Sequence, residues 1–206
     1  MPNYCTNILT VTGDEKEISR FLTTIKQGEL QDHEHFRILD NLLPTPKELS
    51  NTVKGHFDED TDEYKKNQKQ RKVNLEKFGA PDWYDWNCKN YGSKWSDFEG
   101  QINKQTNTEL VLSFMTAWSP ICEGIRNVSV LFPTLDFVLL YSEGGMAFLG
   151  GVALRQGALI AEIEGEYPQM TEEQLEADDY EGHWEVEEAR LNEIEGILKK
   201  ALSVSV

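Results

Sequence analysis

Aromatic side chains are concentrated in one short stretch of the sequence, Pro81–Ser96, and they offer the clearest basis for specific chemistry. Three of the five tryptophans and two tyrosines of the chain lie there, and Trp118 follows on a predicted strand end. Indole and phenol rings bury large areas in a core, anchor protein interfaces or stack on the bases of single-stranded nucleic acids. The candidate binding residues, called the aromatic cluster below, are Trp83, Tyr84, Trp86, Tyr91, Lys94, Trp95 and Trp118.

The favoured interpretation of the aromatic cluster is a small core that fastens a long insertion to the rest of the fold. A protein-binding surface and a base-stacking surface stay open as alternatives, although the RNA-recognition signature is absent. Lys94 next to Trp95 predicts a cation–π contact. A small basic patch precedes the cluster and could contact phosphates, but it is typical of a solvated helix face. Its residues are Lys65, Lys66, Lys69, Arg71 and Lys72.

The second candidate surface is acidic. Residues 160–195 hold fourteen carboxylates against one base, Arg190, so they carry −13 of the formal net charge of −16. Such a segment is either a solvated face or a surface that engages a basic partner, for instance by imitating DNA. A nucleic-acid binder needs a basic footprint, which this chain as a whole lacks. The predicted acidic surface consists of Glu172, Glu173, Glu176, Asp178, Asp179, Glu181, Glu185, Glu187 and Glu188.

Residues that could catalyse a reaction or bind a metal form no recognisable set. His33 and His35 flank Glu34, but no further ligand follows at a metal-binding spacing. Cys88 lies beside Lys89 without a histidine nearby and is predicted to be a packed thiol. The nucleophile-elbow and phosphate-loop motifs are missing. We therefore predict no catalytic residues, no metal and no cofactor, with an enzyme of unknown chemistry as a third alternative.

The remaining bulk features predict a protein of a reducing cytoplasm. The three cysteines are odd in number and widely spaced, which indicates neither a disulfide framework nor a zinc site. The first residues do not resemble a signal peptide, and no apolar run approaches the length of a membrane span. The length of 206 residues suits one well-filled domain with elaborations.

The elements that must position these residues follow a strand–helix–strand order twice. Alternation predicts a strand at Asn7–Thr12, and a helix follows in which Asp14 is the cap and Ile18, Phe21, Leu22 and Ile25 form the apolar face. Further predicted strands lie at Phe36–Leu43, Thr108–Met115, Asp136–Ser142, Met146–Leu154 and Ala158–Glu164, with a two-residue turn at Gly144-Gly145. Ser119-Pro120 predicts the start of another helix, and Leu191, Ile194, Leu198 and Ala201 mark a C-terminal one.

This order predicts an α+β fold with the ferredoxin-like split βαβ arrangement, a mostly antiparallel sheet with helices on one face. The strands that begin near Asn7 and Thr108 should lie side by side in the centre of the sheet. We expect one domain over residues 1–164 with an aromatic-containing insertion at 47–105. Residues 165–206 form an acidic linker and a C-terminal helical extension packed on the same domain.

Several motifs resemble the YubB-like, also called Api-like, proteins of phages and plasmids. They are Asn3-Tyr4-Cys5-x-Asn7, Asp82-Trp83-Tyr84-x-Trp86, Asn90-Tyr91-Gly92-Ser93-Lys94-Trp95, Thr116-Ala117-Trp118-Ser119-Pro120 and Tyr141-x-Glu143-x-Gly145. The resemblance extends to about Gly157, and Tyr4, Tyr91 and Ser93 depart from the expected Trp, Trp and Thr. It implies a ferredoxin-like domain and a setting in mobile genetic elements, but no established activity and no catalytic residues.

Together these observations favour a non-enzymatic accessory protein that binds a host protein with a basic surface. One such role is an acidic, nucleic-acid-mimicking inhibitor of a host defence system. Single-stranded nucleic-acid binding through the aromatic cluster is the alternative.

Overall fold

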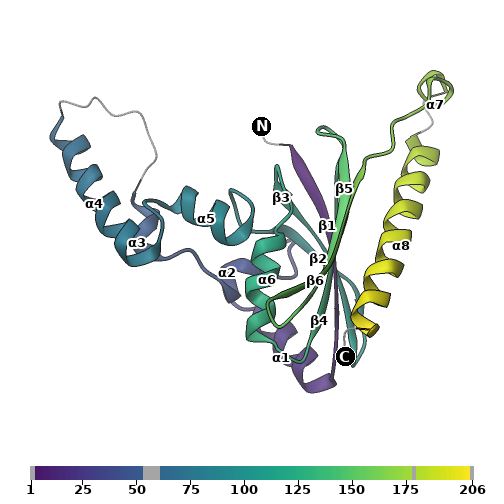
Figure 1. Ribbon diagram of the computed structural model, residues 1–206, viewed down its shortest axis with the longest axis horizontal. Coiled ribbons are helices and arrows are strands. Elements are labelled where there is room, and N and C mark those ends of the chain that lie inside the picture. The colour runs from purple at the N-terminus through teal and green to yellow at the C-terminus, as the bar shows by residue number, and fades with distance from the viewer. Residues whose placement is uncertain (1–2, 53–60, 178–179, 205–206) are drawn as a thin grey trace.

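Residues 3–52, 61–177 and 180–204 are described by a computed structural model, in which one antiparallel sheet organises the fold (Figure 1). Within these residues the six strands are hydrogen-bonded in the order β2-β3-β1-β4-β5-β6. The strands are β1 (Tyr4–Thr12), β2 (Phe98–Gln105), β3 (Glu109–Ala117), β4 (Asp136–Glu143), β5 (Phe148–Arg155) and β6 (Ala158–Glu166). The helices are α1 (Glu15–Ile25), α2 (Leu39–Leu42), α3 (Lys47–Ser50), α4 (Asp62–Phe78), α5 (Trp83–Tyr91), α6 (Cys122–Leu131), α7 (Glu172–Glu176) and α8 (Tyr180–Val204).

Two split βαβ units build the centre of the sheet. The unit β1–α1–β2 has β3 between its strands, and the unit β3–α6–β4 has β1 between its strands. Strand β1 pairs antiparallel with both β3 and β4, and β2 pairs antiparallel with β3, so the two strands of each unit run parallel to one another. This is the ferredoxin-like α+β arrangement predicted from the element order, with β1 and β3 adjacent as expected. The hairpin strands β5 and β6 then extend the sheet beyond β4.

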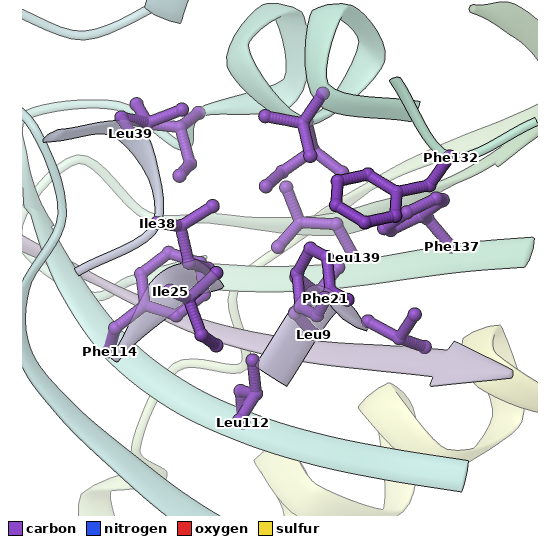
Figure 2. Packing of buried hydrophobic residues seen from close by; sticks show 14 of the residues in the cluster. Leu9, Phe21, Ile25, Ile38, Leu39, Leu112, Phe114, Phe132, Phe137 and Leu139 are labelled. Carbon is purple, nitrogen blue, oxygen red and sulfur yellow. The ribbon is translucent and has the colours of Figure 1, made fainter. Parts of the chain in front are cut away.

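The main core lies on the face of the sheet covered by α1 and α6. Figure 2 shows Phe21 of α1 beside Leu9 of β1, and the rings of Phe21 and Phe137 of β4 meet edge to face with centroids 5.8 Å apart. The rings of Phe21 and Phe132 meet edge to face with centroids 5.1 Å apart. The apolar stripe of α1 begins after Asp14, whose side chain accepts a hydrogen bond from the backbone N–H of Glu17 at 3.1 Å.

A second core lies on the opposite face, under α8. Val138 and Leu140 of β4 contact this helix through its buried residues Leu191, Ile194 and Leu198. Alternate residues of β4 therefore serve the two cores, as the two-residue repeat of a strand requires. In Figure 1 the sheet separates α6 on one side from α8 on the other. Across the described ranges, no helix combines the length and the hydropathy of a membrane span.

The prediction of a strand at Phe36–Leu43 is wrong, because Leu39–Leu42 form the short helix α2. The buried carboxylate of Asp97 accepts hydrogen bonds from the backbone N–H groups of Ile38 at 2.7 Å and Leu39 at 2.8 Å. These two donors would otherwise be unpaired at the start of a helix. A short apolar run without clear periodicity is compatible with a strand or a helix. Here the carboxylate of Asp97, distant in sequence, stabilises the helix.

The place predicted for that strand is taken by β2, so the insertion predicted at 47–105 is wrong at its C-terminal end. Phe98–Gln105 pair with β3 at the edge of the sheet, with register shifts after Phe98 and after Ile102. Its polar residues obscure any alternation, which is common for an edge strand. The segment between the two strands of the first split βαβ unit therefore contains α2 to α5 and ends before Phe98.

Two local predictions also need correction. Helix α6 begins at Cys122 with Ile121 as its N-cap, two residues after the predicted start, because the hydroxyl of Ser119 instead donates to the carbonyl of Gly92 at 2.6 Å. The β4–β5 hairpin turns over residues 144–147 rather than over two glycines alone. The Glu143 carboxylate holds this turn by accepting from the N–H groups of Gly145 at 2.9 Å and Met146 at 2.6 Å.

Candidate functional site

The inner half of the aromatic cluster is buried, as the favoured interpretation predicted, but it is part of the main core and does not form a small core of its own. Trp86 and Tyr91 are buried and meet edge to face at 5.4 Å, and Trp83 packs against the same core. The Tyr91 hydroxyl donates to the carbonyl of Leu43 at 2.8 Å and lies 3.0 Å from the Thr45 hydroxyl. Burial raises the pKa of Tyr91 to about 12. These rings connect α5 to the segment after α2 and are not available to a ligand.

Hydrogen bonds fasten the same stretch to the sheet. The buried hydroxyl of Ser93 donates to the carbonyl of Ala117 at 3.0 Å, at the end of β3. The side chain of Asn127 on α6 donates to the carbonyl of Asn90 at 3.0 Å. Both bonds link residues distant in sequence, so they position α5 against the end of β3 and against α6.

The basic patch is partly structural. Asp82 is fully buried, caps α5 by accepting from the N–H of Asp85 at 2.9 Å, and forms an ion pair with Arg71 of α4. Asn74 of α4, also buried, donates to the hydroxyl of Thr52 at 2.9 Å. Arg71 therefore joins α4 to α5, and the exposed cations left in the patch are Lys65, Lys66, Lys69 and Lys72.

The outer half of the aromatic cluster remains accessible. Trp95 and Trp118 are 39% and 44% exposed, and the Lys94 ammonium lies 4.4 Å from the centroid of the Trp95 ring, which is the predicted cation–π contact. Trp118 has a φ of +70°, a left-handed conformation that is unusual for a bulky residue. A shallow depression of about 390 Å³ is lined by Tyr84, Cys88, Lys94 and Trp118 among others. Cys88 is exposed, so its prediction as a packed thiol is wrong.

The acidic surface lies on α7 and on the first turns of α8. Six of its carboxylates are exposed and make no ion pair within the described part of the chain; they are Glu172, Glu173, Glu176, Glu181, Glu185 and Glu188. Glu187 is half-buried and accepts a hydrogen bond from the Tyr167 hydroxyl at 2.6 Å. Asp178 and Asp179 lie outside the described residues.

Large apolar side chains are interleaved with these carboxylates, and the sequence reasoning missed them. Leu175, Tyr180 and Trp184 are each more than half exposed, and Val186 is 46% exposed. His183, next to Trp184 in sequence, is instead buried, and its ring centroid lies 5.4 Å from that of Tyr167. The fifth tryptophan of the chain, inside an acidic tract, was the available signal, because tryptophan is enriched among the residues that dominate binding at protein interfaces.

The candidate metal ligands do not converge. His33 and His35 are both exposed beside β2, where the His35 imidazole accepts from the N–H of Ile102 at 3.4 Å. Over residues 3–52, 61–177 and 180–204, no group of three His, Cys, Asp or Glu side chains has the arrangement of a metal site.

Comparisons with known proteins identify the fold of the C-terminal part. Residues 97–184, from the start of β2 into α8, match the family model described as the ferredoxin-like domain in Api92-like protein. Comparison with the curated proteins gives no match. Among solved structures, the crystal structure of protein api92 from Yersinia pseudotuberculosis is 12% identical and covers 83% of this chain and 100% of that chain, with a TM-score of 0.43.

The match bears out the family resemblance, and two of the motifs that carry it, Thr116–Pro120 and Tyr141–Gly145, lie within the matched residues. Strand β1 lies outside the matched residues in sequence and inside the same sheet in space, between β3 and β4. From β2 into α8, the chain therefore matches the ferredoxin-like domain of Api92-like proteins.

Proposed function

We propose that this protein acts without catalysis by binding a partner protein with a basic surface through its acidic surface on α7 and α8. The observation that carries the proposal is the set of six exposed carboxylates that no described cation neutralises. Their charge is available to an incoming partner, because an ion pair within the chain would have to be broken before a new one formed. The nearby exposed Tyr180 and Trp184 provide anchors of the type that dominate protein interfaces.

The biological setting that fits is a phage or plasmid accessory protein in the bacterial cytoplasm. An acidic helix surface can cover the nucleic-acid-binding site of a basic protein, as an inhibitor of a host defence system would. Complementary charge raises the association rate and makes binding weaker as salt increases. Salt sensitivity is therefore a required property of the complex.

The test is affinity purification from a bacterial lysate with four glutamates changed to glutamine in α7 and α8. The acidic variant carries changes at Glu173, Glu181, Glu185 and Glu188. The control variant removes the same charge from exposed residues elsewhere, at Glu15, Glu29, Glu63 and Glu76. We expect wild type and the control variant to recover the same basic protein and the acidic variant to lose it. Recovery of no partner, or equal recovery by all three proteins, contradicts the proposal.

Single-stranded nucleic-acid binding through the aromatic cluster is a second candidate. Its support is the exposure of Trp95 and Trp118, with Lys94 beside them and four exposed lysines on α4. The buried Trp86 and Tyr91 cannot stack on bases, so the available surface is smaller than the sequence predicted. Fluorescence anisotropy with a labelled single strand at low salt decides the matter, and the absence of binding at micromolar protein removes this candidate.

A further inference from the structure

A groove of about 580 Å³ lies beside α8 on the sheet face that carries the second core. Its floor includes Ile8 of β1, Val111 of β3 and Leu140 of β4, and one wall is formed by α8 through Trp184, Glu188 and Asn192. The helix packs over β4 and β5, so the groove opens where the sheet continues to β1 and β3.

The floor of this groove is apolar and incompletely covered. Leu110 and Leu112 point into the main core and are fully buried, whereas Val111 between them points to the opposite face and is only half-buried. In β1, likewise, Leu9 is fully buried in the main core, whereas its neighbour Ile8 points to the opposite face and is only half-buried. Two aliphatic side chains in the middle of a sheet thus retain contact with solvent that a bound apolar side chain would remove.

The two ends of the groove differ in charge. At one end, Lys199 lies 2.8 Å from Glu195 and 3.8 Å from Glu109, which also pairs with Lys104, so these charges balance one another. At the other end, Trp184 is 63% exposed, and Glu188 follows one helical turn later without an ion pair among the described residues. A ring face and a carboxylate one turn apart suit a guanidinium group, which stacks on indole and bonds to carboxylate.

We infer that this groove receives a segment of the basic partner in which an apolar side chain is flanked by arginine or lysine. The apolar side chain covers Ile8 and Val111, while the cation lies between Trp184 and Glu188. This inference rests on the proposed function and makes it more specific, because it assigns the partner contact to one side of α8. The other side of the helix, with Glu185 and Val186, carries similar residue types and provides matched controls.

The test uses a short fluorescein-labelled peptide of alternating arginine and leucine and follows its anisotropy with the full chain. Two control peptides distinguish the contribution of charge from that of apolar contact. A peptide of alternating arginine and serine lacks the apolar side chains, and one of alternating glutamate and leucine lacks the positive charge. We expect the arginine–leucine peptide to bind most tightly and the glutamate–leucine peptide not to bind. Trp184→Ala should weaken binding about tenfold and Glu188→Gln about threefold, while Val186→Ala and Glu185→Gln change it less than about twofold. All four side chains are exposed, so these variants should keep the fold.

Methyl NMR locates the peptide independently of affinity. On binding, the methyl signals of Ile8 and Val111 should shift, while those of Leu22, in the main core on the opposite face, stay in place. Equal losses for the variants on the two sides of α8, unshifted Ile8 and Val111 signals, or no preference for the arginine–leucine peptide would overturn the groove assignment. The lysate experiment tests the proposed function separately, because three of its four substitutions, at Glu173, Glu181 and Glu185, lie outside the lining of this groove.

Discussion

At the scale of single residues, the Arg71–Asp82 ion pair is the contact with the clearest energetic consequence. Asp82 is fully buried and Arg71 is largely covered, so each charge depends on the other for compensation. We predict that Arg71→Ala lowers the free energy of unfolding by about 3 kcal/mol, because it leaves an uncompensated buried carboxylate. Urea denaturation measures this change, with the exposed neighbour Lys72→Ala as the control. Equal stability of the two variants would contradict a structural role for Arg71.

We predict that the protein loses stability in alkaline solution because the buried Tyr91 hydroxyl must ionise there. Its pKa is raised to about 12 by burial, while an exposed tyrosine titrates near pH 10. The folded state therefore holds this proton more tightly than the unfolded state does, and the free energy of unfolding should fall as the pH rises from about 10 toward 12. Tyr91→Phe should reduce that slope, although it also leaves the Leu43 carbonyl without its hydrogen bond and costs about 1 kcal/mol at neutral pH. An unchanged alkaline slope in this variant would show that Tyr91 is not the group responsible.

Residue types alone could not show which residues of the aromatic cluster are buried and which are exposed. The family resemblance pointed to Trp86, Tyr91 and Trp118 alike, yet the first two are buried and the third is exposed. The difference comes from contacts with Leu43, Thr45 and the sheet, which lie far from the cluster in sequence. Cys88 was misjudged for the same reason, because exposure depends on tertiary neighbours that local sequence does not reveal.

At the scale of elements, α8 is held to the sheet by one row of residues. Leu198 is fully buried against β5, where a side chain at Gly151 would meet its Cδ1 atom at 2.8 Å. Leu198→Ala should lower the free energy of unfolding by about 3 kcal/mol through lost burial and the resulting cavity. The adjacent Ile197 is half exposed, so Ile197→Ala should change stability by less than about 0.5 kcal/mol. Thermal or urea unfolding compares the two variants, and similar losses would argue against the observed orientation of α8.

Elements with strong periodicity were predicted well, and elements defined by distant partners were not. The strands near Asn7 and Thr108 and the helix over Ile18–Ile25 follow from alternation and a helical stripe, and the structure has them in these places. Helix α2 depends on Asp97, roughly sixty residues away in sequence, and β2 is a polar edge strand that only its partner β3 defines. Neither relation is visible in a local pattern.

At the scale of the whole molecule, the two sheet faces have different roles. The face under α1 and α6 carries the larger core. The sheet formed by the matched residues 97–184 is completed by β1, which lies outside them in sequence. The opposite face carries α8, the groove and the acidic surface. The predicted element order gave the correct fold although it placed the second strand at Phe36–Leu43 and not at β2. The groove depends on the position of α8, which an amphipathic pattern does not specify.

The concentration of charge on α7 and α8 makes the proposed complex sensitive to ionic strength. We predict that its dissociation constant rises at least about tenfold between low and high salt, because exposed charges are screened beyond a few ångströms in concentrated salt. Apolar contacts in the groove should leave a residual, salt-insensitive affinity that Trp184→Ala removes. Binding that is independent of salt would exclude the acidic surface as the main contact.

The central claim is that α7 and α8 bind a basic partner, and the most direct test is a calorimetric titration of that partner, once purified, with three forms of this protein. These are wild type, the variant with glutamine at Glu173, Glu181, Glu185 and Glu188, and the control variant with glutamine at Glu15, Glu29, Glu63 and Glu76. We predict that the first variant binds at least about tenfold more weakly than wild type and that the control variant binds within about twofold of it. Equal weakening by both variants, or no weakening by either, would contradict the claim.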